Sequence, residues 1–140
     1  MKKIIENYKN LKILITGNTG FKGTWLSHWL LNMGAKVVGV GLPPEKESVL
    51  FKELNLNRRV KQYIFDIKNL NKINQIVKKE KPDLIFHLAA QSIVSSSYRD
   101  PLKTFQSNIL GSANLLESFR KNNTPSMIYI TSDKCYLNLD

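Results

Sequence analysis

The sequence contains one cysteine, Cys135, so no disulfide bond can form within the chain. A lone cysteine is typical of proteins in a reducing compartment, and we expect a cytoplasmic location with Cys135 as a small hydrophobic side chain. Long apolar runs are also missing, because no segment approaches the roughly 20 residues that a membrane-spanning helix needs. The first residues lack the apolar stretch of a secretory signal peptide. These absences favour a globular intracellular protein.

Histidine is scarce as well. The two histidines, His28 and His87, lie far apart in the sequence, and with one cysteine they provide no ligand set for a metal ion. We expect His28 to pack beside Trp25 and Trp29 in a helix. His87 falls at the end of a predicted strand, where a buried, hydrogen-bonded core residue is a more common outcome than a catalyst.

Acidic residues are few, with 11 Asp and Glu against 21 Lys and Arg, which gives a formal net charge of +10. The basic residues are scattered, and neither a recognition helix nor a set of stacking aromatics accompanies them, so no nucleic-acid partner is expected. A polyanion-binding face is the alternative that charge alone leaves open. With 140 residues, 42% of them hydrophobic, the chain should form one domain.

Short β-rich segments alternate with segments of helical periodicity. The sequence predicts five strands, at residues 11–16, 36–40, 60–65, 83–88 and 126–131. It predicts four helices between them, at residues 21–33, 48–54, 69–79 and 100–121. This alternation is typical of the α/β class, a doubly wound parallel sheet of the Rossmann type, ending after about the fifth strand.

The long helices have apolar residues at helical spacing. In the first helix these are Trp25, Leu26, Trp29, Leu30 and Met33, and in the third we expect Leu70, Ile73, Ile76 and Val77 to face inward. The last helix begins with Asp100 as N-cap and Pro101 at its first position. Its expected buried residues are Phe105, Ile109, Leu115, Leu116 and Phe119.

A glycine-rich loop joins the first strand to the first helix. Gly17, Gly20 and Gly23 have G-x-x-G-x-x-G spacing. In such a loop one glycine permits the tight turn, one lets backbone amides approach a pyrophosphate, and one allows close helix packing. The free N–H groups at the helix N-terminus attract the phosphates. At this place in a βαβ unit, the loop favours a dinucleotide over an unliganded glycine turn.

Two details limit what the loop specifies. The order Lys22-Gly23-Thr24 excludes a mononucleotide P-loop, which needs Gly-Lys-Thr. An acidic residue about 20 positions on would bind the adenosine ribose of NAD, but residues 40–43 contain none and the first acid is Glu45. The choice between NAD and NADP therefore stays open.

Together, several motifs resemble the extended short-chain dehydrogenase/reductases, the nucleotide-sugar dehydratases and epimerases. They are Thr16-Gly17-x-x-Gly20-Phe21-x-Gly23, Asp66-Ile67, His87-Leu88-Ala89-Ala90-Gln91, Asn108 and Thr131-Ser132-Asp133. Two narrower stretches, 16–26 and 131–136, resemble the CDP-glucose 4,6-dehydratase branch of this family.

The resemblance implies NAD as cofactor and assigns residue roles. The implied cofactor-binding residues are Gly17, Thr19, Gly20, Phe21, Lys22, Gly23, Asp66, Ile67, Leu88, Ala89, Ala90, Gln91, Asn108 and Thr131. Ser132, Asp133 and Lys134 fall where the dehydratases have a hydroxyl, a general acid and a general base. The alternative is structural, with Asp133 capping a turn and Lys134 a solvated charge.

The family also needs a Tyr-x-x-x-Lys pair about 20 to 25 residues beyond Ser132-Asp133. The one such pair here, Tyr8 and Lys12, precedes the first strand and is interpreted as a chance match. We therefore expect residues 1–140 to be an incomplete NAD(P)-binding Rossmann domain that lacks the sugar-nucleotide-binding lobe and turnover. The resemblance implies CDP-glucose as the substrate and a homodimer for the full-length enzyme. A non-catalytic NAD-binding module or gene remnant, and an epimerase or reductase, are the alternatives.

Overall fold

The computed structural model describes residues 6–44 and 49–132, which form a three-layer α/β fold. Five parallel strands lie in the order β3-β2-β1-β4-β5. Their bounds are β1 Lys12–Thr16, β2 Lys36–Gly41, β3 Lys61–Ile64, β4 Leu84–His87 and β5 Met127–Tyr129. The predicted fold class is confirmed.

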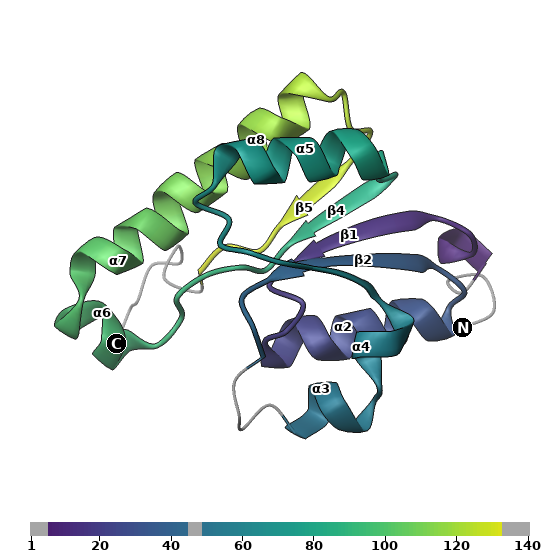
Figure 1. Ribbon diagram of the computed structural model, residues 1–140, viewed down its shortest axis with the longest axis horizontal. Coiled ribbons are helices and arrows are strands. Elements are labelled where there is room, and N and C mark those ends of the chain that lie inside the picture. Colours follow the sequence, from purple (N-terminus) through teal and green to yellow (C-terminus); the bar gives the residue numbers. More distant parts are fainter. Residues whose placement is uncertain (1–5, 45–48, 133–140) are drawn as a thin grey trace, which may run out of the picture.

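Helices cover both faces of this sheet (Figure 1). One face carries α2 (Phe21–Asn32), α3 (Val49–Glu53) and α4 (Leu56–Arg59), and the other carries α5 (Leu70–Glu80) and α8 (Gly111–Lys121). Between β4 and α8 the chain forms α6 (Val94–Arg99), α7 (Pro101–Phe105) and a π-helical segment, η1 (Gln106–Leu110). The sequence predicted neither α4, nor α6, nor the π-helical segment.

Alternating side chains of the strands supply two cores. Ile13 and Ile15 face α2 and α4, whereas Leu14 faces α5 and α8 together with Ile73 and Val77. This alternation is what a buried central strand requires. As predicted, Leu70 and Ile76 pack against the second of these cores.

The apolar residues at helical spacing in α2 do not form its inward face as a set. Trp25 is 40% exposed and Trp29 is 59% exposed, while small residues, Gly23, Thr24 and Ser27, are buried beside Leu30. A tryptophan on the inner face would hold the helix away from the sheet, so the small side chains take that face and the indoles turn outward.

The last helical run also buries less than predicted. Leu115 is buried and Phe119 packs partly against the core, but Phe105, Ile109 and Leu116 are 60%, 60% and 44% exposed. For Phe105 and Ile109 the cause is geometric, because α7 and η1, which carry them, extend beyond the edge of the sheet and have no sheet face to cover (Figure 1).

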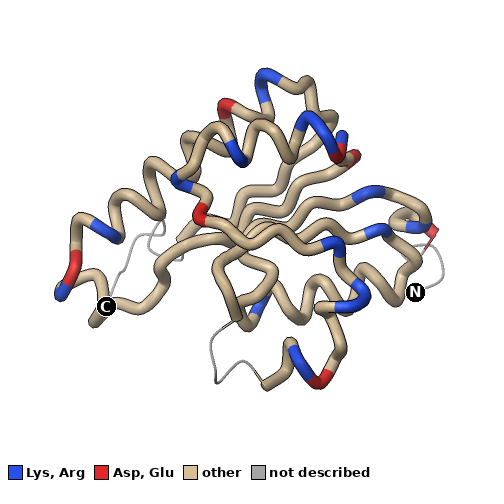
Figure 2. Tube along the Cα trace, in the orientation of Figure 1, with Lys and Arg blue, Asp and Glu red and all other residues tan. Residues whose placement is uncertain are grey.

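The charged residues are distributed over the described structure. Figure 2 shows Lys and Arg on helices of both faces of the sheet and near the starts of several strands. This scatter agrees with a solvated, lysine-rich surface.

The buried carboxylate of Glu80 in α5 contacts lysines at the amino-terminal ends of β1 and β3. The Glu80 side chain is 3% exposed, accepts a hydrogen bond from Tyr63 Oη at 2.5 Å and pairs with Lys61 Nζ at 2.8 Å. Lys12 Nζ lies 3.9 Å from the same carboxylate and donates to the Glu80 carbonyl at 2.7 Å. Burial pushes the pKa of Glu80 upward, but the hydrogen bonds from Lys61 and Tyr63 outweigh it, and the pKa is lowered.

We expect Glu80→Gln to lower the free energy of unfolding by about 1–2 kcal/mol, because glutamine keeps the acceptor geometry but loses the charge. Urea denaturation at neutral pH measures the change. The control is Glu117→Gln, since Glu117 pairs with Arg120 and Lys121 at the surface, where ion pairs contribute little. Equal effects of the two substitutions would contradict the assignment.

Candidate functional site

The glycine loop occupies the carboxyl end of β1, where the strand order reverses between β2 and β4. Such a switch point is where open α/β sheets bind ligands. Gly17 has φ +74° and its N–H donates to Val40 O at 2.7 Å. A Cβ atom on Gly17 would lie 2.7 Å from Ala89 N and 2.8 Å from Ala89 Cα. Gly17 therefore makes the turn and also allows the loop after β4 to approach.

Gly23 allows α2 to pack against this loop. A Cβ atom there would overlap the carbonyl oxygen of Gly17 and would lie 2.6 Å from Asn18 Cα. Both contacts, to Gly17 and to Asn18, are closer than real Cβ atoms make, so a side chain at position 23 would force α2 away from the loop.

Gly20 differs from its two neighbours in the motif. Its φ is −78°, and a Cβ atom would have only one neighbour within 4 Å, Gly17 O at 3.4 Å. Positive φ thus occurs at Gly17 and not at Gly20, so a side chain at position 20 would project into open space without backbone strain.

The space in front of Gly20 suits a phosphate group. Gly20 is the N-cap of α2 and provides no capping side chain, and the first turn of the helix has no acidic residue. The first helical hydrogen bond runs from Thr24 N–H to Gly20 O at 2.8 Å, so the amides of Phe21, Lys22 and Gly23 precede it. These amides, the positive end of the helix dipole and Lys22 fit a dinucleotide pyrophosphate.

Two side chains of the loop after β1 bond to the chain just after β2 and to β3. Thr19 Oγ1 donates to Leu42 O at 3.0 Å. The fully buried Asn18 exchanges two hydrogen bonds with Gln62, at 2.6 and 3.0 Å. No carboxylate occurs in residues 41–44, and Glu45 lies outside the described residues.

Asp66 and Ile67 follow β3, as expected for residues near an adenine. The Asp66 carboxylate accepts from Lys68 N–H at 3.0 Å and pairs with Lys68 Nζ at 3.3 Å. Ile67 is 4% exposed, and a Cβ atom on Gly111 would lie 2.6 Å from its Cδ1. The side chain of Ile67 therefore belongs to the core, and any contact it makes to a base runs through its backbone.

The loop after β4, residues 88–91, is held at both ends. Leu88 N–H donates to Thr16 O at 3.1 Å, and Ala89 N–H donates to Thr16 Oγ1 at 3.3 Å. At the other end, Gln91 N–H donates to Asn108 Oδ1 at 2.7 Å and Asn108 Nδ2 donates to Gln91 O at 2.9 Å. Ala90 is exposed between these anchors. The loop is thus a fixed wall beside Gly17.

These contacts give Asn108 a positioning role, and its expected cofactor contact stays a prediction. Both ends of its side-chain amide bond to the backbone of Gln91, so Asn108 positions the loop. It lies in η1, and π-helical turns inside α-helices occur frequently at functional sites.

Of the predicted catalytic residues, the structure describes Ser132, which follows β5 at its carboxyl end. Thr131 and Ser132 are exposed and follow Ile130, whose N–H donates to His87 O at 3.1 Å. Asp133, Lys134 and Cys135 lie outside the described residues. Because β1, β4 and β5 are parallel neighbours, Ser132 is at the same edge of the sheet as the glycine loop.

The two histidines have different environments. His87 is 2% exposed and hydrogen-bonded, as predicted. His28 makes an edge contact with Trp25 at 6.4 Å between ring centroids, and it also bonds to Asn32 and Arg59 near the surface. Among residues 6–44 and 49–132, no three His, Cys, Asp or Glu side chains are grouped as a metal site would require. Within the same residues no helix is long and apolar enough to cross a membrane.

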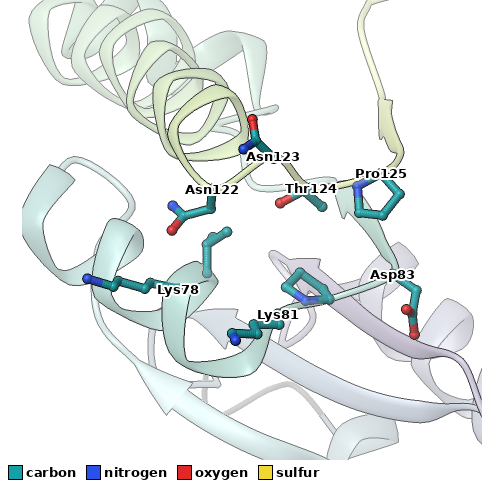
Figure 3. Close-up of a pocket in the computed structure, with 9 residues that line it drawn as sticks. Lys78, Lys81, Asp83, Asn122, Asn123, Thr124 and Pro125 are labelled. Atoms are coloured by element: carbon teal, nitrogen blue, oxygen red, sulfur yellow. The ribbon is translucent and has the colours of Figure 1, made fainter.

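A surface hollow lies at the opposite end of the strands, near their amino termini. Figure 3 shows it between the end of α5, with Lys78 and Lys81, and residues 122–125 after α8. It also contacts Asp83, which precedes β4. The amino end of β4 is remote from the glycine loop, so this hollow is separate from the candidate site. Tyr8 precedes β1 and Lys12 begins it, so this Tyr-x-x-x-Lys pair also lies at the amino-terminal end of the strands. Its position agrees with a chance match to the catalytic pattern.

Comparison with protein families gives a match over most of the chain. The family model described as GDP-mannose 4,6 dehydratase matches residues 14–138. CDP-glucose 4,6-dehydratase of Salmonella typhimurium is 39% identical over 132 residues, which cover 94% of this chain and 37% of that protein. Protein CapI of Staphylococcus aureus is 35% identical over 130 residues, 90% of this chain and 39% of that protein. The chain thus spans less than two fifths of the length of these two relatives.

Solved structures resemble the fold. UDP-glucose 4-epimerase from Stenotrophomonas maltophila, with NAD and formylated UDP-arabinopyranose bound, has a TM-score of 0.82 at 24% identity over 94% of this chain and 40% of that one. This likeness shows the fold alone. UDP-glucose 4-epimerase of Thermus thermophilus, in complex with NAD, has a TM-score of 0.72 at 27% identity over 84% of this chain and 36% of that one.

Proposed function

This chain belongs to the GDP-mannose 4,6 dehydratase family, and from that membership we propose that residues 1–140 are the NAD-binding part of a nucleotide-sugar 4,6-dehydratase. The observation that carries the proposal is the open space in front of Gly20, bordered by three amides at the start of α2 and closed behind by Gly17 and Gly23. The NAD complexes among the similar structures support the choice of cofactor. Because residues 40–43 contain no acid to bind the adenosine ribose, NADP stays as the alternative cofactor.

When bound, NAD supplies the acceptor and donor for the hydride that leaves and returns to the sugar. The chain's own residues bind and orient it. The amides of Phe21, Lys22 and Gly23 and the Lys22 ammonium hold the pyrophosphate, and Asp66 with the backbone of Ile67 borders the adenine. The wall formed by Leu88, Ala89, Ala90 and Gln91, with Thr131 after β5, lines the nicotinamide side.

CDP-glucose is the substrate that we propose, and the 39% identity to the Salmonella dehydratase supports it. In the proposed reaction, the 4-ketone acidifies the C5 proton and the hydroxyl leaves from C6. Asp133 protonates that hydroxyl as general acid, Lys134 removes the C5 proton as general base, and Ser132 hydrogen-bonds the reacting sugar. A lysine acts as a base only where burial or neighbouring cations lower its pKa.

An epimerase is the second candidate, because solved epimerases share the fold at up to 31% identity. The Asp133-Lys134 pair favours the dehydratase, since an epimerase has no hydroxyl to expel from C6. We place either enzyme in the cytoplasm, in the synthesis of polysaccharide precursors.

The proposal predicts NAD binding without turnover. No Tyr-x-x-x-Lys pair follows β5 within residues 1–140, so this polypeptide lacks the base that opens the reaction. Calorimetry with NAD and NADP, followed by product analysis with CDP-glucose and UDP-glucose, tests both parts. Binding of neither cofactor would contradict the cofactor assignment, and a 4-keto-6-deoxy product would contradict the absence of turnover.

An open frame encoding Tyr-x-x-x-Lys downstream of codon 140 would favour the enzyme over a non-catalytic module or gene remnant.

A second copy of the chain is the partner that we propose for the exposed apolar stripe on α7 and η1. Leu102, Phe105 and Ile109 are 67%, 60% and 60% exposed and follow one another at helical spacing. We expect concentration-dependent dimers in sedimentation equilibrium, and weaker association after Ile109→Lys. A monomer at all concentrations would exclude this interface.

A further inference from the structure

His87 lies at the centre of a buried polar chain that the proposed chemistry does not use. It ends β4, between Thr16 of β1 and Tyr129 of β5. Its Nδ1 lies 2.6 Å from Thr16 Oγ1, and its Nε2 lies 2.9 Å from Ser112 Oγ in α8. The Tyr129 ring stacks on the imidazole, with 4.9 Å between centroids and 15° between planes. His87 thus contacts three elements that surround the candidate site.

The hydrogen-bond inventory allows one tautomer of this imidazole. Ser112 has a single hydroxyl proton, which it donates to Asn108 O at 2.7 Å, and it accepts from Tyr129 Oη at 3.0 Å. Its remaining lone pair faces Nε2, so Nε2 must carry the proton. Nδ1 is then an acceptor and takes the hydroxyl proton of Thr16.

The same chain of hydrogen bonds reaches the loop after β4, which lies beside the glycine motif. Because the Thr16 proton points at Nδ1, the lone pairs of Thr16 Oγ1 face Ala89 N–H, which donates to it at 3.3 Å. Ala89 N–H, the Thr16 hydroxyl, His87 Nε2–H and the Ser112 hydroxyl therefore each donate to the next group, and the Asn108 carbonyl is the final acceptor. Every member is satisfied, and Asn108 in turn holds Gln91.

We infer that His87, as the neutral Nε2–H tautomer, is a positioning residue that fixes Thr16 Oγ1 and, through it, the cofactor-facing loop 88–91. The inference rests on the proposed function in taking that loop as a wall of the NAD site. Its direction is specific, because the Nδ1 branch reaches Ala89 of the loop through the single hydroxyl of Thr16, whereas the Nε2 branch runs to Ser112 of α8 and ends on the backbone carbonyl of Asn108.

Two substitutions separate the branches. In His87→Asn, the side-chain oxygen replaces Nδ1 as the acceptor for Thr16, but nothing reaches Ser112. In His87→Gln, the terminal amide nitrogen replaces Nε2 as the donor to Ser112, but Thr16 loses its acceptor. At the other end of the bond, Thr16→Val removes the hydroxyl and Thr16→Ser restores it. A purely structural role for His87 would give both of its variants the same defects.

The experiment combines nitrogen NMR of the imidazole, amide hydrogen exchange at Ala89 and NAD titration by calorimetry. The chain has only two histidines, so His28→Gln leaves one imidazole signal and also serves as the control variant. We expect a protonated Nε2 and a bare Nδ1. We expect about tenfold faster Ala89 exchange and about tenfold weaker NAD binding in His87→Gln and Thr16→Val. His87→Asn, Thr16→Ser and His28→Gln should stay within about threefold of the wild type.

An Nδ1–H tautomer, or equal Ala89 exchange in the two His87 variants, would overturn the inference. If both His87 variants failed to fold, the Thr16 pair would decide in the same way. NMR and hydrogen exchange need no ligand, so failure of the wild type to bind NAD would refute the proposed function and leave these two measurements decisive for His87.

Discussion

Replacing Gly20 by valine is expected to weaken NAD binding by about two orders of magnitude or more, while the protein stays folded. The valine side chain would project into the open space in front of α2, where the pyrophosphate is proposed to lie. Losing two charge-assisted hydrogen bonds to the amides of Phe21 and Lys22, each contributing roughly 1.5–3 kcal/mol, accounts for the effect. At φ −78° the backbone of residue 20 accepts a side chain without strain.

Calorimetric titration of NAD into the two proteins measures the difference, and circular dichroism checks the fold. The matched control is Gly23→Val, which places the same side chain against Gly17 and Asn18 and should destabilise the fold itself. Equal NAD affinity of the wild type and a well-folded Gly20→Val protein would mean that the dinucleotide does not lie on this loop.

Acidification is expected to destabilise the fold through His87. Burial lowers the pKa of His87 from 6.5 to about 4. The unfolded chain therefore binds a proton between these two values that the folded chain does not, so stability falls as the pH falls. The loss should amount to about 3 kcal/mol between pH 7 and pH 4. Thr16, Ser112 and Tyr129 contact the ring, and none of them offers a carboxylate to stabilise an imidazolium.

Urea denaturation across this pH range measures the loss, and His87→Asn should flatten the profile because asparagine does not titrate. The lowered pKa of Glu80 adds a further loss only below its ordinary value of 4.5, where the protonated carboxyl releases Lys61. An unchanged pH profile in His87→Asn would show that another group is responsible.

The strands and the glycine loop could be predicted because local patterns determine them. Buried strands such as β1 are short apolar runs, and a turn with positive φ at Gly17 needs glycine. The inward face of α2 could not be predicted from hydrophobicity, since close packing there selects the small residues Thr24 and Ser27 over Trp25 and Trp29. On this face of α2 the size of a side chain, more than its hydrophobicity, decides whether it is buried.

The site was predicted in part for the same reason. The motif was sufficient to place Gly20 at the start of α2, where we propose the anion site. The role of Asn108 depends on a contact with Gln91, 17 residues away, and on a π-helical turn that no sequence pattern announced. The tie between His87 and Ser112 is likewise non-local, across 25 residues. Contacts of this kind exist only once β4 and α8 are packed.

The three glycines of the loop are subject to different selection. Gly17 and Gly23 are required by the folded chain itself, because a side chain at either position would meet backbone atoms. At Gly20 the nearest such atom, Gly17 O, would lie 3.4 Å away in an ordinary contact, so only a bound ligand would require glycine there. In a lineage that kept the fold but abandoned the dinucleotide, Gly20 should therefore be the first of the three to drift, and its identity records whether binding is still under selection.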